Sequence, residues 1–96
     1  MANITLLNGV SANTTGSGAS VTGACAVHTD NLLHTEAVTI QMALADTAAD
    51  YRTVSRIPGP DPMIIRIDNP GTYYLRAILS GVASGRSGTV TVKACQ

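Results

Sequence analysis

The chain has 96 residues, the size of one domain, and charged residues make up only 12% of it with a formal net charge of zero. It contains no Trp and no Phe, so a core must be built mainly from aliphatic side chains. Lys93 is the single lysine, the arginines form no basic stripe, and no apolar run approaches the roughly 18 residues of a membrane-spanning helix, which argues against nucleic-acid and membrane partners.

The first third of the chain predicts three short strands, at residues 4–7, 19–22 and 24–28. Asn8 and Gly9 are expected to end the first of these strands. Residues 11–18 are rich in Gly, Ser and Thr, and we expect them to form a flexible polar connection. Gly23 separates the second strand from the third, which indicates a bulge or a corner.

The strongest strand signal is the alternation of apolar and polar side chains at residues 36–45. Four apolar side chains share one face of that strand: Val38, Ile40, Met42 and Leu44. Because alternate side chains on a strand point the same way, this face is expected to pack in the core. A polar loop at 46–50 and a strand at 51–55 follow, which predicts a hairpin. The alternative is a helical turn over residues 42–50, since Ala is the best helix former.

Three further strands are predicted in the second half of the chain, at residues 63–67, 72–79 and 89–95. Residues 58–62 hold three of the four prolines, so we expect a rigid turn there. Residues 80–88 carry mostly small side chains, and we expect them to form a loop. In the last strand, Val90, Val92 and Ala94 are predicted to face inward.

About seven or eight short strands, separated by regular turn signals, are typical of an antiparallel β-sandwich or a small barrel. We therefore predict an all-β fold, Ig-like or jelly-roll-like in its arrangement. The whole chain, residues 1–96, is expected to form this single domain.

The adjacent Tyr73 and Tyr74 must face opposite sides of their strand. We expect one ring to pack in the core. The other either joins Ile64 and Ile78 in an apolar contact patch or is buried as well, in a strand covered on both faces.

Cys25 and Cys95 are the only cysteines, and two interpretations of them stay open. A disulfide between them would close a loop of about 70 residues and contribute about 4 kcal/mol. Two reduced thiols are the alternative, and they are typical of a cytoplasmic product.

Candidate metal ligands are few. His28 with Asp30, and His34 with Glu36, are each spaced to share one face of a strand. A zinc site needs three or four ligands, so a polar loop is the simpler interpretation of these pairs.

Candidate catalytic residues are also few. Cys25 lies three residues before His28, a spacing that fixes no dyad, and no Gly-x-Ser-x-Gly motif is present. Asp46 and Asp50 could form a carboxylate pair, but a hairpin tip offers no cleft for them. We therefore expect no catalytic, cofactor-binding or metal-binding residues, no cofactor and no enzyme.

Several segments resemble small virion proteins of tailed bacteriophages. The opening Met-Ala-Asn-Ile-Thr-Leu-Leu-Asn, followed by a Gly/Ser/Thr-rich link, resembles the start of many of these proteins. The Val-x-Ile-Gln-Met strand, the Asp-bearing tip at 46–50 and Tyr51-Arg52-Thr53-Val54 continue the resemblance. Residues 69–77 are similar to their Gly-x-Tyr-Arg-Ala strand, except that an extra Tyr-Leu separates Tyr73 from Arg76.

The resemblance implies a β-sandwich that decorates a capsid as a cement protein or completes a phage head. It also implies a homo-oligomer without a cofactor, bound to the major capsid protein or other virion subunits. We expect a virion location after synthesis in the host cytoplasm. Contacts are expected from the N-terminal third or from residues 57–62 and 80–88. The alternatives are a receptor- or glycan-binding module of a fibre or cell surface, and an enzyme accessory domain.

Overall fold

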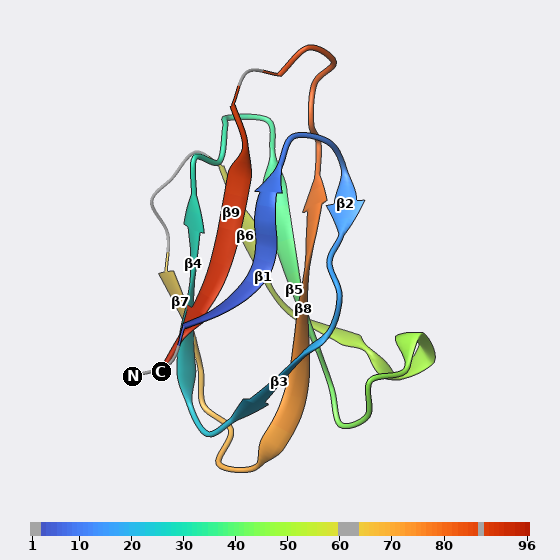
Figure 1. Ribbon diagram of the computed structural model, residues 1–96, viewed down its shortest axis with the longest axis vertical. Coiled ribbons are helices and arrows are strands. Elements are labelled where there is room, and N and C mark those ends of the chain that lie inside the picture. Colours follow the sequence, from blue (N-terminus) through green and yellow to red (C-terminus); the bar gives the residue numbers. More distant parts are fainter. Residues whose placement is uncertain (1–2, 60–63, 87) are drawn as a thin grey trace.

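The computed structural model describes residues 3–59, 64–86 and 88–96, and it is all-β (Figure 1). Two antiparallel sheets pack face to face as a sandwich. The strands are β1 (Asn3–Val10), β2 (Thr14–Thr15), β3 (Ala19–Thr22), β4 (Cys25–Asp30), β5 (Ala37–Ala43), β6 (Arg52–Pro58), β7 (Ile64–Ile67), β8 (Thr72–Ser80) and β9 (Val90–Cys95). One 3-10 turn, η1 (Ala48–Asp50), lies between β5 and β6.

Sheet A has the strand order β1-β9-β4-β7, and sheet B has the order β2-β8-β5-β6, with β3 also paired to β8. The β4–β5 and β8–β9 connections both cross from one sheet to the other. Because β4 is antiparallel to β9 and β5 is antiparallel to β8, these two crossovers lie side by side at one end of the sandwich. The strand β9, last in the chain, lies between β1 and β4.

The sandwich confirms the predicted fold class, with nine strands in place of seven or eight. The additional strand is β2, which lies inside the segment expected to be a flexible connection. Its Thr14 and Thr15 pair with Leu79 and Ile78 of β8. Gly16 continues this attachment, since its amide donates to the carbonyl oxygen of Ala77 at 2.8 Å.

Aliphatic side chains from the inner faces of the two sheets form one core. The predicted alternation is confirmed in β8 and β9, where every second side chain is buried: Tyr73, Leu75, Ala77 and Leu79, and Val90, Val92 and Ala94. Burying a Val, Leu or Ile side chain contributes about 1.5–3 kcal/mol, so these two strands supply much of the hydrophobic stabilisation. Gly23, between β3 and β4, has a φ of 83° and forms the expected corner.

β1 extends beyond its predicted end at Asn8 and Gly9 and reaches Val10. Its pairing with β9 shifts register twice, between Thr5 and Leu7 and again after Leu7. Such irregularities let consecutive side chains point to one side, and both Leu6 and Leu7 are buried. Asn8 and Gly9, the residues expected to end the strand, therefore lie at an irregularity within it.

The predicted hairpin of β5 and β6 is confirmed, and its loop contains the short turn η1 in place of a helix over 42–50. The prediction for Leu44 is wrong: β5 ends at Ala43, and the Leu44 side chain is 80% exposed. The alternation of the sequence continues past the end of the strand, but once the backbone turns away from the sheet it no longer directs side chains to the core. Figure 1 shows this hairpin projecting from the side of the sandwich.

Candidate functional site

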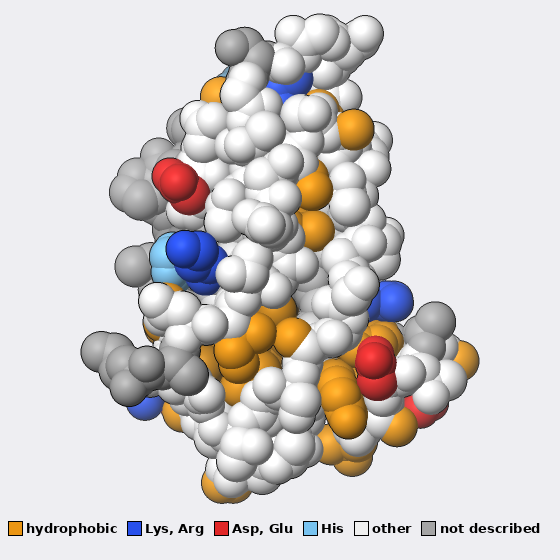
Figure 2. Space-filling view, in the orientation of Figure 1, with side chains coloured by type: hydrophobic (Ala, Val, Ile, Leu, Met, Phe, Trp, Pro, Cys, Tyr) orange, Lys and Arg blue, Asp and Glu red, His pale blue; other side chains and the backbone are white. Residues whose placement is uncertain are grey.

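The outward face of sheet A carries a polar groove. His28 and Asp30 point outward from β4, because the alternate residues Val27 and Thr29 are buried. Lys93 and Thr91 point outward from β9 for the same reason, and the strand register places Lys93 opposite His28 and Thr91 opposite Asp30. Figure 2 shows this face, with a His side chain beside a Lys or Arg side chain and an acidic side chain above them.

The groove has a volume of about 490 Å³. Its lining residues all carry a polar or charged side chain: Thr5, Asn8, His28, Thr29, Asp30, Thr91 and Lys93. A cation and an anion, Lys93 and Asp30, therefore lie in one groove with several hydrogen-bonding side chains. Such a surface can bind a polar ligand that carries both charges.

The two cysteines lie on opposite faces of sheet A, and both are free thiols. Cys25 faces the core, where its sulfur lies 3.5 Å from the Tyr73 hydroxyl. Cys95 faces outward and is half-buried, and its sulfur lies 3.1 Å from Nε2 of His28. In the structure both cysteines are therefore reduced thiols. The cysteine beside His28 is Cys95, which is distant in sequence, and not Cys25.

The buried Tyr73 hydroxyl donates to the carbonyl oxygen of Gly23 at 2.6 Å. Burial raises the pKa of Tyr73, and the hydrogen bond with Cys25 raises it further. Tyr73 is thus the ring that packs in the core, as both interpretations required. Tyr74 and Ile78 are half-buried on the outer face of sheet B, whereas Ile64 belongs to β7 in sheet A and its side chain lies outside the described part of the structure.

The candidate metal pairs do not come together. His28 and Asp30 share the outward face of β4. His34 is exposed in the β4–β5 connection, and the Glu36 side chain in the same connection is buried. Among the residues that the structure describes, no group of three or more His, Cys, Asp or Glu side chains could hold a metal ion.

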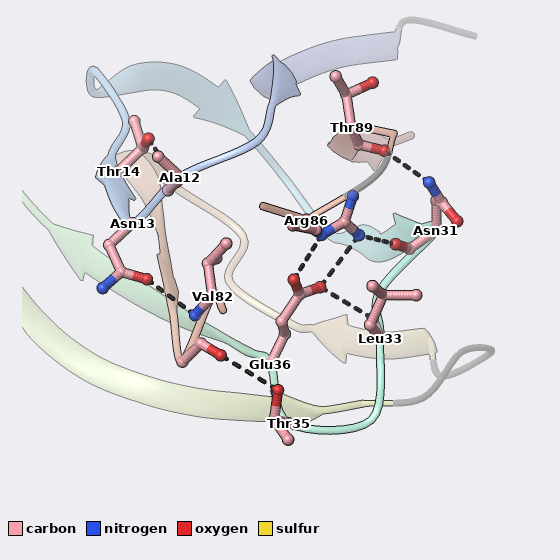
Figure 3. Close-up of polar contacts among 11 residues, drawn as sticks. Ala12, Asn13, Thr14, Asn31, Leu33, Thr35, Glu36, Val82, Arg86 and Thr89 are labelled. Carbon is pink, nitrogen blue, oxygen red and sulfur yellow. Dashed lines mark hydrogen bonds and ion pairs between the residues drawn. The ribbon is translucent and has the colours of Figure 1, made fainter. Parts of the chain in front are cut away.

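Glu36 forms a buried ion pair that connects the two crossovers (Figure 3). It lies in the β4–β5 connection, and its partner Arg86 lies in the β8–β9 connection; both side chains are only 1% exposed. Arg86 Nη2 donates to Glu36 Oε1 at 3.0 Å, Arg86 Nε donates to Oε2, and the Leu33 amide donates to Oε1 at 2.9 Å. The hydrogen bond from Arg86 lowers the pKa of Glu36 below its ordinary value, although burial opposes this shift.

Further hydrogen bonds join the same connections. The Thr35 hydroxyl donates to the carbonyl oxygen of Gly81 at 3.2 Å, and Asn31 Nδ2 donates to the carbonyl oxygen of Thr89 at 3.0 Å. The Val82 amide donates to Asn13 Oδ1 at 3.0 Å, which adds the β1–β2 connection (Figure 3). The described residues of the segment 80–88, expected to be a docking loop, are therefore attached to neighbouring segments by several hydrogen bonds. Of the other expected docking loop, 57–62, residues 60–62 lie outside the described residues.

The loop of the β5–β6 hairpin is held against the outer face of sheet B. The Tyr51 hydroxyl donates to Asp46 Oδ1 at 2.7 Å, and the Arg76 guanidinium lies 4.2 Å from the centroid of the Tyr51 ring. Arg76 Nε also donates to Gln41 Oε1 at 2.7 Å. Burial, followed by the hydrogen bond to Asp46, raises the pKa of Tyr51 to about 12. The Asp46 carboxylate is thus hydrogen-bonded to Tyr51, and Asp50 is exposed in η1.

The same hairpin exposes two apolar side chains. Leu44, directly after β5, is 80% exposed, and Val54, in β6, is 44% exposed. The hairpin therefore combines a loop that is held in place with apolar side chains exposed next to that loop.

Sequence reasoning missed two side-chain pairs, His28 with Cys95 and Glu36 with Arg86. Their members are 67 and 50 residues apart, so no local motif contains them. The one signal available was the strand alternation, which places Cys95 on the face opposite Ala94, although it does not indicate which strand lies beside β9.

Within the described residues, no helix is long and apolar enough to span a membrane. Comparisons with known proteins find no matching family model, no matching curated protein and no matching solved structure.

Proposed function

We propose that this protein is a non-enzymatic structural component of a phage virion, which docks on the capsid and stabilises it as a decoration protein. The observation that carries the proposal is the projecting β5–β6 hairpin with its exposed Leu44. The resemblance of the sequence to small phage virion proteins supports the class of partner, namely the major capsid protein or another virion subunit.

The hairpin is suited to docking because its loop is already ordered. Tyr51 and Asp46 of the loop are held against Arg76 of sheet B, so little conformational entropy remains to be lost when the hairpin is bound. An exposed leucine in a fixed position can fill an apolar depression on a partner.

The surface charge also supports repeated docking. With 12% charged residues and zero net charge, neighbouring copies on a lattice repel one another little. Many weak contacts then add through multivalency, and we propose that the protein acts as a homo-oligomer on the virion, after synthesis in the host cytoplasm.

The test is co-sedimentation with tailed-phage capsids that have been stripped of decoration proteins. We expect Leu44→Asp to weaken binding at least about tenfold, since the loss of an anchoring side chain costs about 2 kcal/mol or more, and about 1.4 kcal/mol is tenfold in affinity. Leu33→Asp is the matched control, because Leu33 is 42% exposed in the first crossover, away from the hairpin. Equal binding of Leu44→Asp and the unmodified protein, or no binding of the unmodified protein to any capsid, would contradict the proposal.

The groove of sheet A supports a second candidate, a receptor- or glycan-binding module. Glycans are recognised by hydrogen-bonding side chains such as those of Asn8, Asp30 and Lys93. The number of copies per particle separates the candidates, since a decoration protein covers the lattice whereas a fibre-tip module is present in few copies. Glycan binding that is lost in Lys93→Ala, together with few copies per particle, would favour this second function.

A further inference from the structure

We propose that Cys95 is a reactive thiol, activated by His28, that exchanges with small peptide disulfides bound in the groove of sheet A. The first observation is the contact between the two side chains. The Cys95 sulfur lies 3.1 Å from His28 Nε2, and the two residues come from the adjacent strands β9 and β4. Cys95 is half-buried on the outward face, so it is accessible from solvent.

Two groups on the outward face of sheet A, a base and a cation, can assist disulfide exchange at Cys95. Since the nucleophile in disulfide exchange is the thiolate, a base and a nearby cation both promote the reaction. His28 Nε2 is placed to accept the thiol proton, and Lys93 lies two residues before Cys95 on the same face of β9.

Two more charged groups belong to this face, and both lie farther from the sulfur. Asp30 is two residues beyond His28 on β4, roughly 7 Å along the strand. Arg66 on β7 is separated from β9 by Ala26 of β4 and is paired with Asp68 at 2.8 Å. Lys93, two residues from Cys95 on the same strand, is therefore the closest charged position on this face of the sheet.

The groove of sheet A, which is lined by His28 and Lys93, indicates the class of disulfide. Lys93 can bind a carboxylate and Asp30 can bind an ammonium group, while Thr5, Asn8 and Thr91 offer hydrogen bonds to peptide groups. A short peptide disulfide with free carboxylates and free amino groups, of the glutathione type, matches this arrangement.

The reaction is a thiol–disulfide exchange. The Cys95 proton passes to His28, and the thiolate attacks one sulfur of the bound disulfide. A new bond forms between that sulfur and Cys95, and the original sulfur–sulfur bond breaks. The departing thiolate takes the proton back from the His28 imidazolium, so Cys95 is oxidised to a mixed disulfide and the released half is reduced to a thiol.

The test is to incubate the folded protein with oxidised glutathione and to locate the adduct by mass spectrometry. We expect modification of Cys95, slowed about tenfold or more in His28→Ala and in His28→Gln, which cannot take up the proton. Cys25 is the internal control: it is 4% exposed and should stay unmodified until the chain is unfolded. Circular dichroism establishes that each variant is folded, and the two His28 substitutions provide independent comparisons.

A second comparison tests the ligand class. Lys93→Met should slow the reaction with oxidised glutathione more than the reaction with neutral bis(2-hydroxyethyl) disulfide, which has no carboxylate for Lys93 to bind. Equal rates in the unmodified protein and both His28 variants would overturn the proposal. So would a Cys95 rate no higher in the folded protein than in the chain unfolded by denaturant.

Discussion

Glu36 holds its charge inside the protein, with a side chain only 1% exposed and hydrogen bonds from Arg86 and the Leu33 amide. In Glu36→Gln the buried guanidinium loses this carboxylate, so we expect the free energy of unfolding to fall by about 3–5 kcal/mol. Denaturant titration measures the change. The matched control is Asp68→Asn, which breaks the exposed Arg66–Asp68 pair and should cost at most about 1 kcal/mol. Equal losses in the two variants would contradict this account.

The same carboxylate predicts sensitivity to acid. The pKa of Glu36 is lower in the folded protein than its ordinary value of 4.5, chiefly because of the hydrogen bond from Arg86. Its contribution to stability is therefore complete above that value and is lost as the pH falls through the folded-state pKa. We expect the difference in melting temperature between the unmodified protein and Glu36→Gln to be large at neutral pH and to shrink in acid. A difference that does not change with pH would contradict this expectation.

At the level of elements, Gly16 joins β2 to β3 where the chain passes close to both sheets. A Cβ atom at Gly16 would meet the backbone oxygens of Leu6 in β1 and Ala77 in β8. We expect Gly16→Ala to destabilise the protein by roughly 1–3 kcal/mol, because backbone atoms of two strands would have to move. Gly71→Ala is the control, since its Cβ would approach only Asn69 Oδ1, at 3.6 Å, and its cost should stay within about 0.5 kcal/mol. Thermal or denaturant unfolding of both variants measures the contrast.

The strands could be predicted wherever the signal is local. The side chains of Tyr73, Leu75 and Leu79 alternate because the pleat itself has a period of two, and neighbours along the chain carry that information. Strand ends are less visible, as Leu44 and the extension of β1 through Gly9 show. In these places the pairing with another strand decides whether the backbone continues, and the pattern of one segment does not contain the register of its partner.

Across the whole molecule, the side-chain pairs could not be predicted at all. His28 meets Cys95 because β9 inserts beside β4, and Glu36 meets Arg86 because two crossovers share one end of the sandwich. Both contacts follow from the order of strands in the sheets. Cys25 is the cysteine near His28 in the chain, and the fold places these two side chains on opposite faces of sheet A.

The position of β9 has a consequence for biosynthesis. This strand lies between β1 and β4, although it is the last of the described strands to leave the ribosome. Until residues 90–95 emerge, a nascent chain has no strand to join β1 to β4, and the apolar side chains of Leu6 and Val27 have no Val92 to pack against. Because β1 and β9 are far apart in sequence, their pairing makes folding of sheet A slow, and a nascent copy stays prone to aggregation until β9 has joined the sheet.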